Sequence, residues 1–467
     1  MKAVLLIDFG STYTKLTAVD LDTETVLGTA AAYTTVQTDI NEGLKKGLAA
    51  LEAKTGKLEY EAKYACSSAA GGLRMVACGL VPELTSEAAR LASLGAGAKV
   101  VGLYSYQLTE DDLEEISRTA PDIFLLSGGT DGGNTANILH NARMLATLPA
   151  TFPIIVAGNR TAARECQRIL EGHQVYLCDN VMPKFGVLNI EPTQKQIREI
   201  FLQRIVEAKG LRQAAVQMSG DMMPTPSAVL RALKLLADGC EEEAGVGDLV
   251  AVDVGGATTD IYSIADGMPE KMNTVYKGLP EPYAKRTVEG DVGMRYSIRG
   301  IVEAAGVKTI SALSGIPQER VEELVDYLAN NTEVVPNGDE ELEALDRALA
   351  SMAVQTAVAR HAGTMEETYT MMGLTYVQSG KNLMHVKKIV VTGGSLIHTK
   401  ETEKIAGFGM YSAAQPASLR PKEADIWVDR SYILAAMGLL SAHAPLCALH
   451  IMKKELEKHG HSEQENS

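Results

Sequence analysis

The sequence predicts an α/β protein with two related domains and a small doubly wound parallel sheet inserted into the chain. A chain of 467 residues is too long for one hydrophobic core, so several domains are expected. The segment AVLLIDFGSTYTKLTAVD at 3–20 recurs as DLVAVDVGGATTDIYSIAD at 248–266, and the two copies align without a gap at an offset of 245 residues. Strand and helix patterns alternate from about 97 to 180, which indicates a parallel sheet.

These patterns divide the chain into five segments. Residues 1–96 are expected to form the N-terminal part of the first domain, 97–190 the inserted Rossmann-like α/β domain and 191–247 a helical connection. Residues 248–455 are expected to form the second domain with a helical insertion. The polar tail at 456–467 is predicted to be disordered.

The first fifty residues predict a three-stranded meander followed by a helix. Short β-branched runs separated by turn residues place the strands at 3–8, 13–20 and 26–34. Apolar residues at helical spacing place a helix at about 40–54, with Leu44, Leu48 and Leu51 on one face.

The rest of the chain is expected to be mainly helical outside the strands of the two repeated segments and of the inserted sheet. In the inserted segment, helices are predicted near 110–118, 135–145 and 161–170. Two more are predicted at about 194–208 and 226–237. After the second copy of the repeat we expect a long helical stretch at 339–371, a strand at 386–394 and closing helices.

Composition excludes several classes of function. The formal net charge of −15 argues against a nucleic-acid partner, because phosphate contacts need a clustered basic surface. The six cysteines form no CxxC pair and the nine histidines no HExxH motif, so neither a zinc site nor a redox motif is predicted. Free thiols, an early Asp8 and the lack of an 18-residue apolar run predict a soluble cytoplasmic protein without a membrane partner.

The two copies of the repeat have the features of phosphate-binding hairpins. Each places an aspartate (Asp8, Asp253) at the end of a strand and a glycine (Gly10, Gly255) two residues later. Glycine lets backbone N–H groups approach phosphate oxygens, because it has no Cβ and allows positive φ. An aspartate there can hold a hydrated Mg²⁺. One such hairpin alone is an ordinary turn, but its recurrence favours a pair that clamps a nucleotide polyphosphate.

A third motif, KIVVTGGSLIH at 388–398, ends a buried strand just before a predicted helix. In third place behind two phosphate hairpins, Gly393, Gly394 and Ser395 are expected to form the floor of an adenosine site. A side chain at either glycine would then project into the nucleoside's space. The alternative is a parallel strand followed by a tight turn.

This order of motifs resembles the superfamily of actin, the Hsp70 chaperones and the sugar kinases. The resemblance implies two actin-like (ribonuclease H-like) domains flanking a nucleotide cleft, with ATP or ADP and Mg²⁺ as ligands. It implies that Asp8 and Asp253 are catalytic and hold Mg²⁺ and the attacking water. The implied phosphate contacts are Gly10, Ser11 and Thr12 in the first hairpin and Gly255, Gly256, Thr258 and Thr259 in the second.

The segment VEGDVGMR at 288–295 stands where chaperone-type members carry a glycine-rich segment ahead of a helix that lines the nucleotide. Gly290, Asp291, Gly293 and Arg295 are therefore candidates for nucleotide binding, and a helix N-cap formed by Asp291 is the alternative. Ala257 stands where the chaperone-like pattern has a third glycine, so the second hairpin departs from that phosphate-binding pattern at one position.

The whole chain resembles the accessory proteins of adenosylcobalamin-dependent amino-acid mutases, the glutamate (methylaspartate) mutase-associated MutL family. The segments that carry the resemblance are LLIDFGSTYTKLTAVD, FLLSGGTDGGN, AVDVGGATTDIYS, VEGDVGMR and VVTGGSL. The implied role is ATP-driven reactivation of the mutase, in which damaged cobalamin is released, with slow ATP hydrolysis stimulated by the partner. A small-metabolite kinase and a nucleotide-binding scaffold without hydrolysis are the alternatives.

The inserted domain raises a separate hypothesis. Its strand and helix order is similar to that of the cobalamin-carrying domain of those mutases, although the DxHxxG motif that would ligate cobalt is absent from the sequence. The domain could imitate its counterpart in the mutase, or it could be a generic doubly wound insertion. The turn SGGTDGGN at 127–134 suits anion binding, and it could equally be a tight turn without a ligand.

Overall fold

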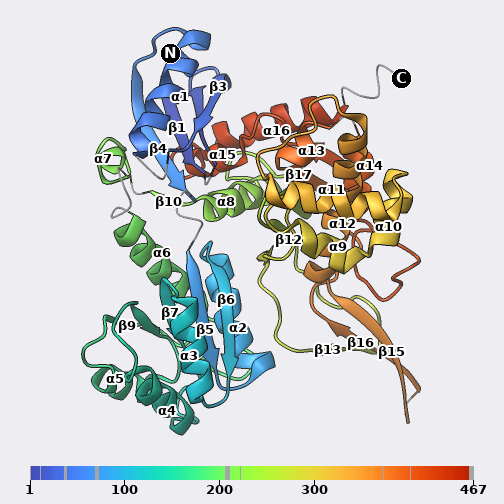
Figure 1. Cartoon of the computed structure of the whole chain (residues 1–467). Helices are drawn as coiled ribbons and strands as arrows, with labels where there is room; N and C mark the ends of the chain where they lie inside the picture. The colour runs from blue at the N-terminus through green and yellow to red at the C-terminus, as the bar shows by residue number, and fades with distance from the viewer. Residues whose placement is uncertain are drawn as a thin grey trace. The chain divides into compact units, whose positions relative to one another are not determined.

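The computed structural model describes residues 2–10, 12–35, 39–68, 73–205, 211–220, 222–371, 373–399 and 401–461 (Figure 1). The chain divides into two compact units. The first contains residues 1–232, 278–280 and 435–448, and the second contains 233–277, 281–434 and 449–467. The domain limits predicted from the sequence remain predictions.

The first unit begins with a five-stranded mixed sheet in the order β10-β4-β1-β2-β3. The first three strands form the predicted antiparallel meander, while β4 pairs parallel to β1 and β10 parallel to β4. Every residue of the central strand β1 is buried, and α1 packs on β2 and β3. The elements are β1 (Ala3–Phe9), β2 (Tyr13–Asp20), β3 (Thr25–Tyr33), α1 (Ile40–Thr55), β4 (Tyr60–Ser67) and β10 (Met223–Pro224).

The second sheet of the first unit is the predicted parallel one, in the order β6-β5-β7-β8-β9, with every neighbouring pair parallel. It includes β5, which lies before the predicted segment 97–190. The run RMVACG of β5 holds only one β-branched residue, Val76, so it did not stand out as a strand. The elements are β5 (Arg74–Gly79), η1 (Pro82–Ser86), α2 (Glu87–Gly95), β6 (Lys99–Ser105), α3 (Glu110–Thr119), β7 (Ile123–Leu126), α4 (Ala136–Leu145), β8 (Ile154–Val156), α5 (Arg160–Ile169) and β9 (Val175–Leu177).

Three helices follow the parallel sheet: α6 (Glu191–Ile205), α7 (Leu211–Val216) and α8 (Thr225–Asp238). α6 and α8 correspond to the helices predicted at about 194–208 and 226–237, although residues 206–208 lie outside the described part of the chain. α8 begins directly after β10, so its first residue lies at the carboxyl end of that strand.

The sheet of the second unit repeats the topology of the first. Its order is β14-β12-β11-β17-β18, with β11, β12 and β14 antiparallel and β17 and β18 added in parallel. The repeat therefore extends from the hairpin to the whole five-stranded sheet, which confirms the predicted actin-like α/β fold. The strands are β11 (Leu249–Val254), β12 (Thr259–Ile264), β14 (Ala284–Glu289), β17 (Lys388–Thr392) and β18 (Asp425–Val428).

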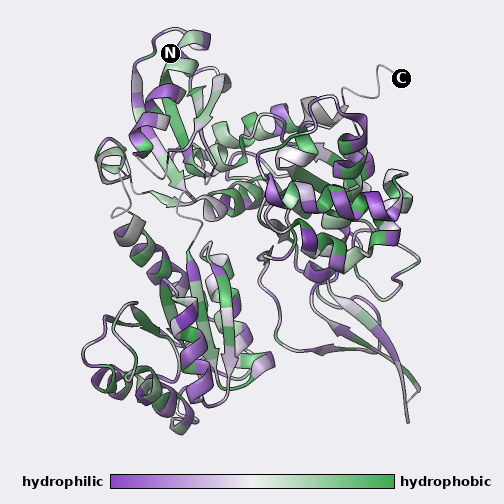
Figure 2. Cartoon of the chain, viewed as in Figure 1, coloured by the Kyte–Doolittle hydropathy of each residue, from purple (hydrophilic) through white to green (hydrophobic). Residues whose placement is uncertain are grey.

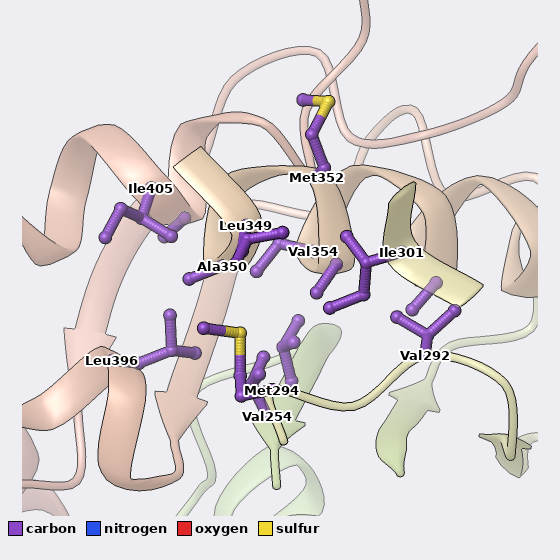
Figure 3. Packing of buried hydrophobic residues seen from close by; sticks show 14 of the residues in the cluster. Val254, Val292, Met294, Ile301, Leu349, Ala350, Met352, Val354, Leu396 and Ile405 are labelled. Atoms are coloured by element: carbon purple, nitrogen blue, oxygen red, sulfur yellow. The ribbon is translucent and has the colours of Figure 1, made fainter. Parts of the chain in front are cut away.

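Helices cover this second sheet, and α12 packs on β11, β12 and β14. Figure 3 shows Val254 of β11, Met294 of the loop between β14 and α9, and Leu349 of α12 converging in the core. In Figure 2 the sheet strands are predominantly hydrophobic, whereas the helices carry both kinds of residue. The helices are α9 (Ile298–Ala305), α10 (Val307–Ser314), α11 (Gln318–Asn330), α12 (Glu340–His361), α13 (Gly394–Ile397), α14 (Thr402–Gly407), α15 (Leu434–Leu440) and α16 (Pro445–His461), of which α15 belongs to the first unit and α16 spans both.

The helical stretch expected at 339–371 is wrong beyond His361. α12 ends there, and β15 (Thr364–Thr370) and β16 (Gly373–Ser379) pair as an antiparallel hairpin, with β13 (Thr274–Lys277) parallel to β16. Gly363 interrupts the helix, and the threonines and tyrosines that follow favour strands. The tail predicted to be disordered begins inside α16, and residues 462–467 lie outside the described part of the chain.

All six cysteines are present as free thiols, four of them buried. Among the described residues, no helix combines the length and the apolar character needed to cross a membrane.

Candidate functional site

The two hairpins share one backbone hydrogen bond. In the first, the N–H of Gly10 donates to the carbonyl oxygen of Tyr13 at 3.1 Å, and in the second the N–H of Gly255 donates to that of Thr258 at 2.9 Å. Both turns follow the central strand of their sheet, β1 or β11. The sequence repeat is therefore also a repeat of this hydrogen bond.

The glycines are needed for close approach and not for positive φ, which corrects one expectation. A Cβ on Gly10 would lie 2.6 Å from the Tyr13 carbonyl oxygen, and one on Gly255 would lie 2.9 Å from that of Thr258. Neither glycine has positive φ, and neither has Gly256. Gly256 is exposed, and a Cβ there would come no closer than 3.8 Å to the Tyr296 ring.

The predicted hydroxyl contacts have different environments. Thr12 is exposed at the tip of the first hairpin, and Ser11 lies outside the described residues. In the second hairpin the Thr258 hydroxyl donates to Asp260 at 3.3 Å. The buried Thr259 hydroxyl donates to the carbonyl oxygen of Val292 at 2.9 Å, so the chain itself already engages it.

Asp8 is held by two residues that the sequence analysis missed. Its side chain is only 8% exposed, and its Oδ1 accepts hydrogen bonds from the Thr225 hydroxyl at 2.6 Å and the Cys66 thiol at 3.4 Å. Burial, followed by the charge of Asp8, raises the pKa of the Cys66 thiol well above its usual value, so the thiol keeps its proton. Both partners are distant in sequence and belong to no motif.

Asp253 is half-buried beside Thr392 of β17. Burial raises the pKa of the Tyr432 phenol, and the charges of Asp253 and Asp429 raise it further, so Tyr432 stays protonated. Tyr432 has a φ of 52°, which is uncommon for a residue other than glycine. Asp429 is buried and accepts hydrogen bonds from the N–H groups of Ile433 and Leu434.

The two glycines of the third motif have different roles. Gly393 has a φ of 98°, and a Cβ there would collide with the carbonyl oxygen of Val254. A side chain at Gly393 would thus strike the neighbouring strand, which corrects the expectation for this residue. Gly394 is exposed at the start of α13, and a Cβ there would meet only the Tyr432 hydroxyl at 3.4 Å. Ser395 is half-buried one residue later.

The segment around 290–297 supports the second hairpin. The N–H groups of Met294 and Arg295 donate to the carbonyl oxygens of Gly255 and Gly256 at 3.0 and 2.8 Å. The Ser297 hydroxyl donates to Ala257 at 2.7 Å and to Gly290 at 3.0 Å, in both cases to the carbonyl oxygen. A Cβ on Gly293 would lie 2.6 Å from the Ala257 carbonyl oxygen, so glycine is required there by close packing.

Two charged side chains of this segment form ion pairs. Arg360 donates to both carboxylate oxygens of Asp291, at 2.8 and 2.9 Å, and α9 has Ser297 as its N-cap residue. The interpretation of Asp291 as an N-cap is therefore wrong. The buried Arg295 makes a bidentate pair with Asp346 of α12 at 3.0 and 2.7 Å, which anchors the segment to the helix.

The glycine-rich turn at 127–134 is held by side chains of its own unit. The buried Asn159 accepts a hydrogen bond from the N–H of Gly132 at 3.1 Å and donates to the carbonyl oxygens of Gly133 and Asn134. The buried Ser127 hydroxyl donates to the carbonyl oxygen of Cys78 at 2.9 Å. These contacts account for a tight turn without a ligand.

The carboxylates of the hairpins fit Mg²⁺. Within the described ranges no group of three or more His, Cys, Asp or Glu side chains gathers as a ready-made metal cage. Asp8 and Asp253 are instead single carboxylates at glycine turns, and Mg²⁺ is usually bound by one or two carboxylates together with substrate phosphates and waters.

Two sheets of one topology, each with a glycine hairpin after its central strand, define an actin-like protein. The chain belongs to the MutL family, because the family model described as MutL protein matches residues 4–456. It is 48% identical over 462 residues to the protein called Protein MutL from Clostridium tetanomorphum, covering 98% of this chain and 100% of that one.

Solved structures also align along most of the chain. A diol dehydratase-reactivating factor in nucleotide-free form aligns with a TM-score of 0.37 and 12% identity, over 95% of this chain and 99% of that one. An activator of 2-hydroxyisocaproyl-CoA dehydratase from Clostridium difficile with bound ADPNP aligns with a TM-score of 0.32 and 9% identity, over 98% of this chain and 97% of that one. These TM-scores are too low for either structure to inform on function.

Proposed function

We propose that the protein is an ATP-dependent reactivating chaperone for a cobalamin-dependent amino-acid mutase, from which it releases damaged cofactor. The observation that supports this proposal best is the repeated hairpin, Gly10 to Tyr13 and Gly255 to Thr258, at the same place in two sheets of the same topology. Membership of the MutL family supports the choice of partner.

In this proposal each hairpin binds phosphate groups of a nucleotide. The N–H groups of the turn residues and the exposed Thr12 would contact phosphate oxygens, while Asp8 and Asp253 would hold Mg²⁺ and orient the attacking water. Bound Mg²⁺ would supply charge neutralisation at the terminal phosphate. Gly394 and Ser395 would lie under the nucleoside. Gly290 and Asp291 would act indirectly, because their segment supports the second hairpin.

The proposed ATPase is slow and is stimulated by its partner. ATP and ADP would favour different states of the chain, and the parallel sheet of the first unit would contact the mutase. If a variant lacking this sheet still binds the mutase as tightly as the full chain, this role of the sheet is wrong.

A reactivation assay separates the proposal from a metabolite kinase on the same fold. One reaction contains ATP, Mg²⁺ and a mutase carrying damaged cobalamin, and the other contains ATP, Mg²⁺ and a panel of small alcohols and acids. Recovery of mutase activity without a phosphorylated product is expected. Stoichiometric phosphorylation of a metabolite would replace the proposal by the kinase, and nucleotide binding without phosphate release would replace it by a scaffold.

A further inference from the structure

Three polar side chains lie at the carboxyl ends of adjacent parallel strands in the first sheet. Asp8 belongs to β1, Cys66 is its register partner on β4, and Thr225 follows β10 directly. The second unit has a matching row, with Asp253 on β11, Thr392 on β17 and Asp429 directly after β18. The two rows can therefore be compared residue by residue.

In the first row, both hydrogen bonds end on the same oxygen. The Thr225 hydroxyl donates to Asp8 Oδ1 at 2.6 Å, and the Cys66 thiol donates to the same atom at 3.4 Å. The hydroxyl bond is the shorter of the two, and a bond to a carboxylate is stronger than one between neutral groups. Oδ1 is thus fixed, which sets the direction of Oδ2.

In the second row the threonine hydroxyl donates to a different aspartate. The Thr392 hydroxyl donates to Asp429 at 3.4 Å, and Asp429 also accepts two backbone N–H groups at the start of α15. The Thr392 hydroxyl therefore donates to Asp429 and not to the hairpin aspartate, Asp253. In the first row, by contrast, the hydroxyl directly after the third strand donates to the hairpin aspartate itself.

We propose that Thr225 is a positioning residue for Asp8. Its hydroxyl, 217 positions away in sequence, holds Oδ1 so that Oδ2 is presented to the ligand of the first hairpin. The identity of that ligand, a hydrated Mg²⁺ at a nucleotide phosphate, rests on the proposed function. The positioning of the carboxylate does not depend on it.

The test compares three threonine variants of the full chain. T225V removes the hydroxyl and keeps the shape of the side chain, while T225S keeps the hydroxyl. T193V is the matched control, because Thr193 is buried and its hydroxyl has no hydrogen-bond partner among the residues that the structure describes.

The first measurement is made without nucleotide. The ¹³C NMR signal of the Asp8 carboxyl carbon, identified by its loss in D8N, should shift in T225V and keep its wild-type position in T225S and T193V. An Asp8 signal that does not move in T225V overturns the inference, whatever the protein binds.

The second measurement connects the positioning to the ligand. Binding of Mn²⁺·ATP, followed by electron paramagnetic resonance, should weaken roughly tenfold in T225V, while metal-free ADP binds within roughly twofold of wild type. T225S should restore most of the loss, which a merely structural defect would not allow. Equal Mn²⁺·ATP affinity in T225V and wild type contradicts the inference when D8N binds Mn²⁺·ATP more weakly than wild type. A wild-type protein that binds no Mn²⁺·ATP contradicts the proposed function instead, and the NMR signal alone then decides the positioning.

Discussion

At the scale of single residues, the second hairpin places a carboxylate near a phenol that keeps its proton. The charges of Asp253 and Asp429 act on Tyr432, whose pKa is already raised by burial. The backbone of Tyr432 has a φ of 52°, and strained residues of this kind concentrate at functional sites. The effect of the Asp253 charge can therefore be measured through the pKa of Tyr432 as well as through the rate of ATP hydrolysis.

Replacing Asp253 by Asn should abolish Mg²⁺-dependent ATP hydrolysis and leave the fold intact. A loss of roughly 100-fold or more in kcat is expected if the carboxylate orients water or metal. The pKa of Tyr432 should fall, because one of the two negative charges that disfavour the phenolate is gone. A ¹³C NMR titration of the Tyr432 ring, identified by the loss of its signal in Y432F, measures this shift without any ligand, with D111N at an exposed position as the control. Hydrolysis at the wild-type rate would remove Asp253 from the mechanism.

Gly394→Val should weaken ATP and ADP alike, by roughly tenfold or more, because the nucleoside is common to both. Within the chain, a Cβ at this position meets only the Tyr432 hydroxyl, at 3.4 Å, so the loss would report on the ligand. Pyrophosphate should bind as before. Calorimetry with the three ligands checks this, and ADP binding at the parent affinity would reduce the third motif to a structural turn. Gly393→Val is unsuitable, because its side chain would strike the Val254 backbone.

Lys381 predicts a pH dependence of stability. Burial, followed by the charge of Lys285, lowers its pKa to about 7, although its ammonium group donates to the Tyr283 carbonyl oxygen at 2.6 Å. The folded state then binds fewer protons than the unfolded state between pH 7 and the ordinary lysine pKa of about 10.4, so stability should rise with pH across that window.

The Lys381→Met variant checks this dependence. Its free energy of unfolding, measured by urea titration, should rise less between pH 7 and pH 10 than that of wild type. The difference between the two rises should be on the order of a few kcal/mol. Lys46→Met, at an exposed position, should behave like wild type. The opposite sign, with wild type losing more stability than the variant as pH rises, would show that Lys381 is charged in the folded state.

At the scale of elements, the second hairpin depends on the segment that packs beneath it. Replacing Gly293 by Ala would bring a Cβ to 2.6 Å from the Ala257 carbonyl oxygen, and backbone atoms cannot give way cheaply. We expect a loss of roughly 1–3 kcal/mol in stability and weaker ATP binding, measured by urea unfolding and calorimetry. Gly407→Ala is the control, because no atom outside its own helical turn and its chain neighbours lies within 4 Å of its Cβ position. Unchanged ATP binding in Gly293→Ala would mean that the segment does not shape the hairpin.

The sequence was sufficient for elements with strong local patterns. The meander at β1 to β3, the helix α1 and both glycine hairpins follow from alternation, helical spacing and glycine placement. β5 was missed because its short run of Met, Val, Ala and Cys has no strand periodicity, and β15 because it follows a long helix across a single glycine. Local sequence patterns alone do not distinguish such strands from loops or from the continuation of a helix.

The candidate site was predictable only where a residue belongs to the repeat. Asp8 and Asp253 lie at equivalent positions of the two copies, and the structure places each at the end of its central strand. Cys66 and Thr225 reach Asp8 through strand order, over 58 and 217 positions of sequence. Tertiary contacts of this kind leave no motif in a single sequence.

At the scale of the whole molecule, the doubled sheet accounts for the doubled hairpin. One unit carries the sequence of the first copy and the other that of the second, and the strand order repeats with it. If the proposed function is right, each copy contributes to the binding of nucleotide phosphates. A change in either hairpin should then weaken nucleotide binding.

Calorimetric titration with Mg²⁺·ATP tests this claim most directly, on wild type and on one variant of each hairpin. Thr12→Val alters the exposed tip of the first hairpin, and Gly256→Val adds a side chain at an open position of the second. We expect each variant to weaken the binding of Mg²⁺·ATP several-fold or more. Wild-type affinity for Mg²⁺·ATP in either variant would contradict the role proposed for that hairpin.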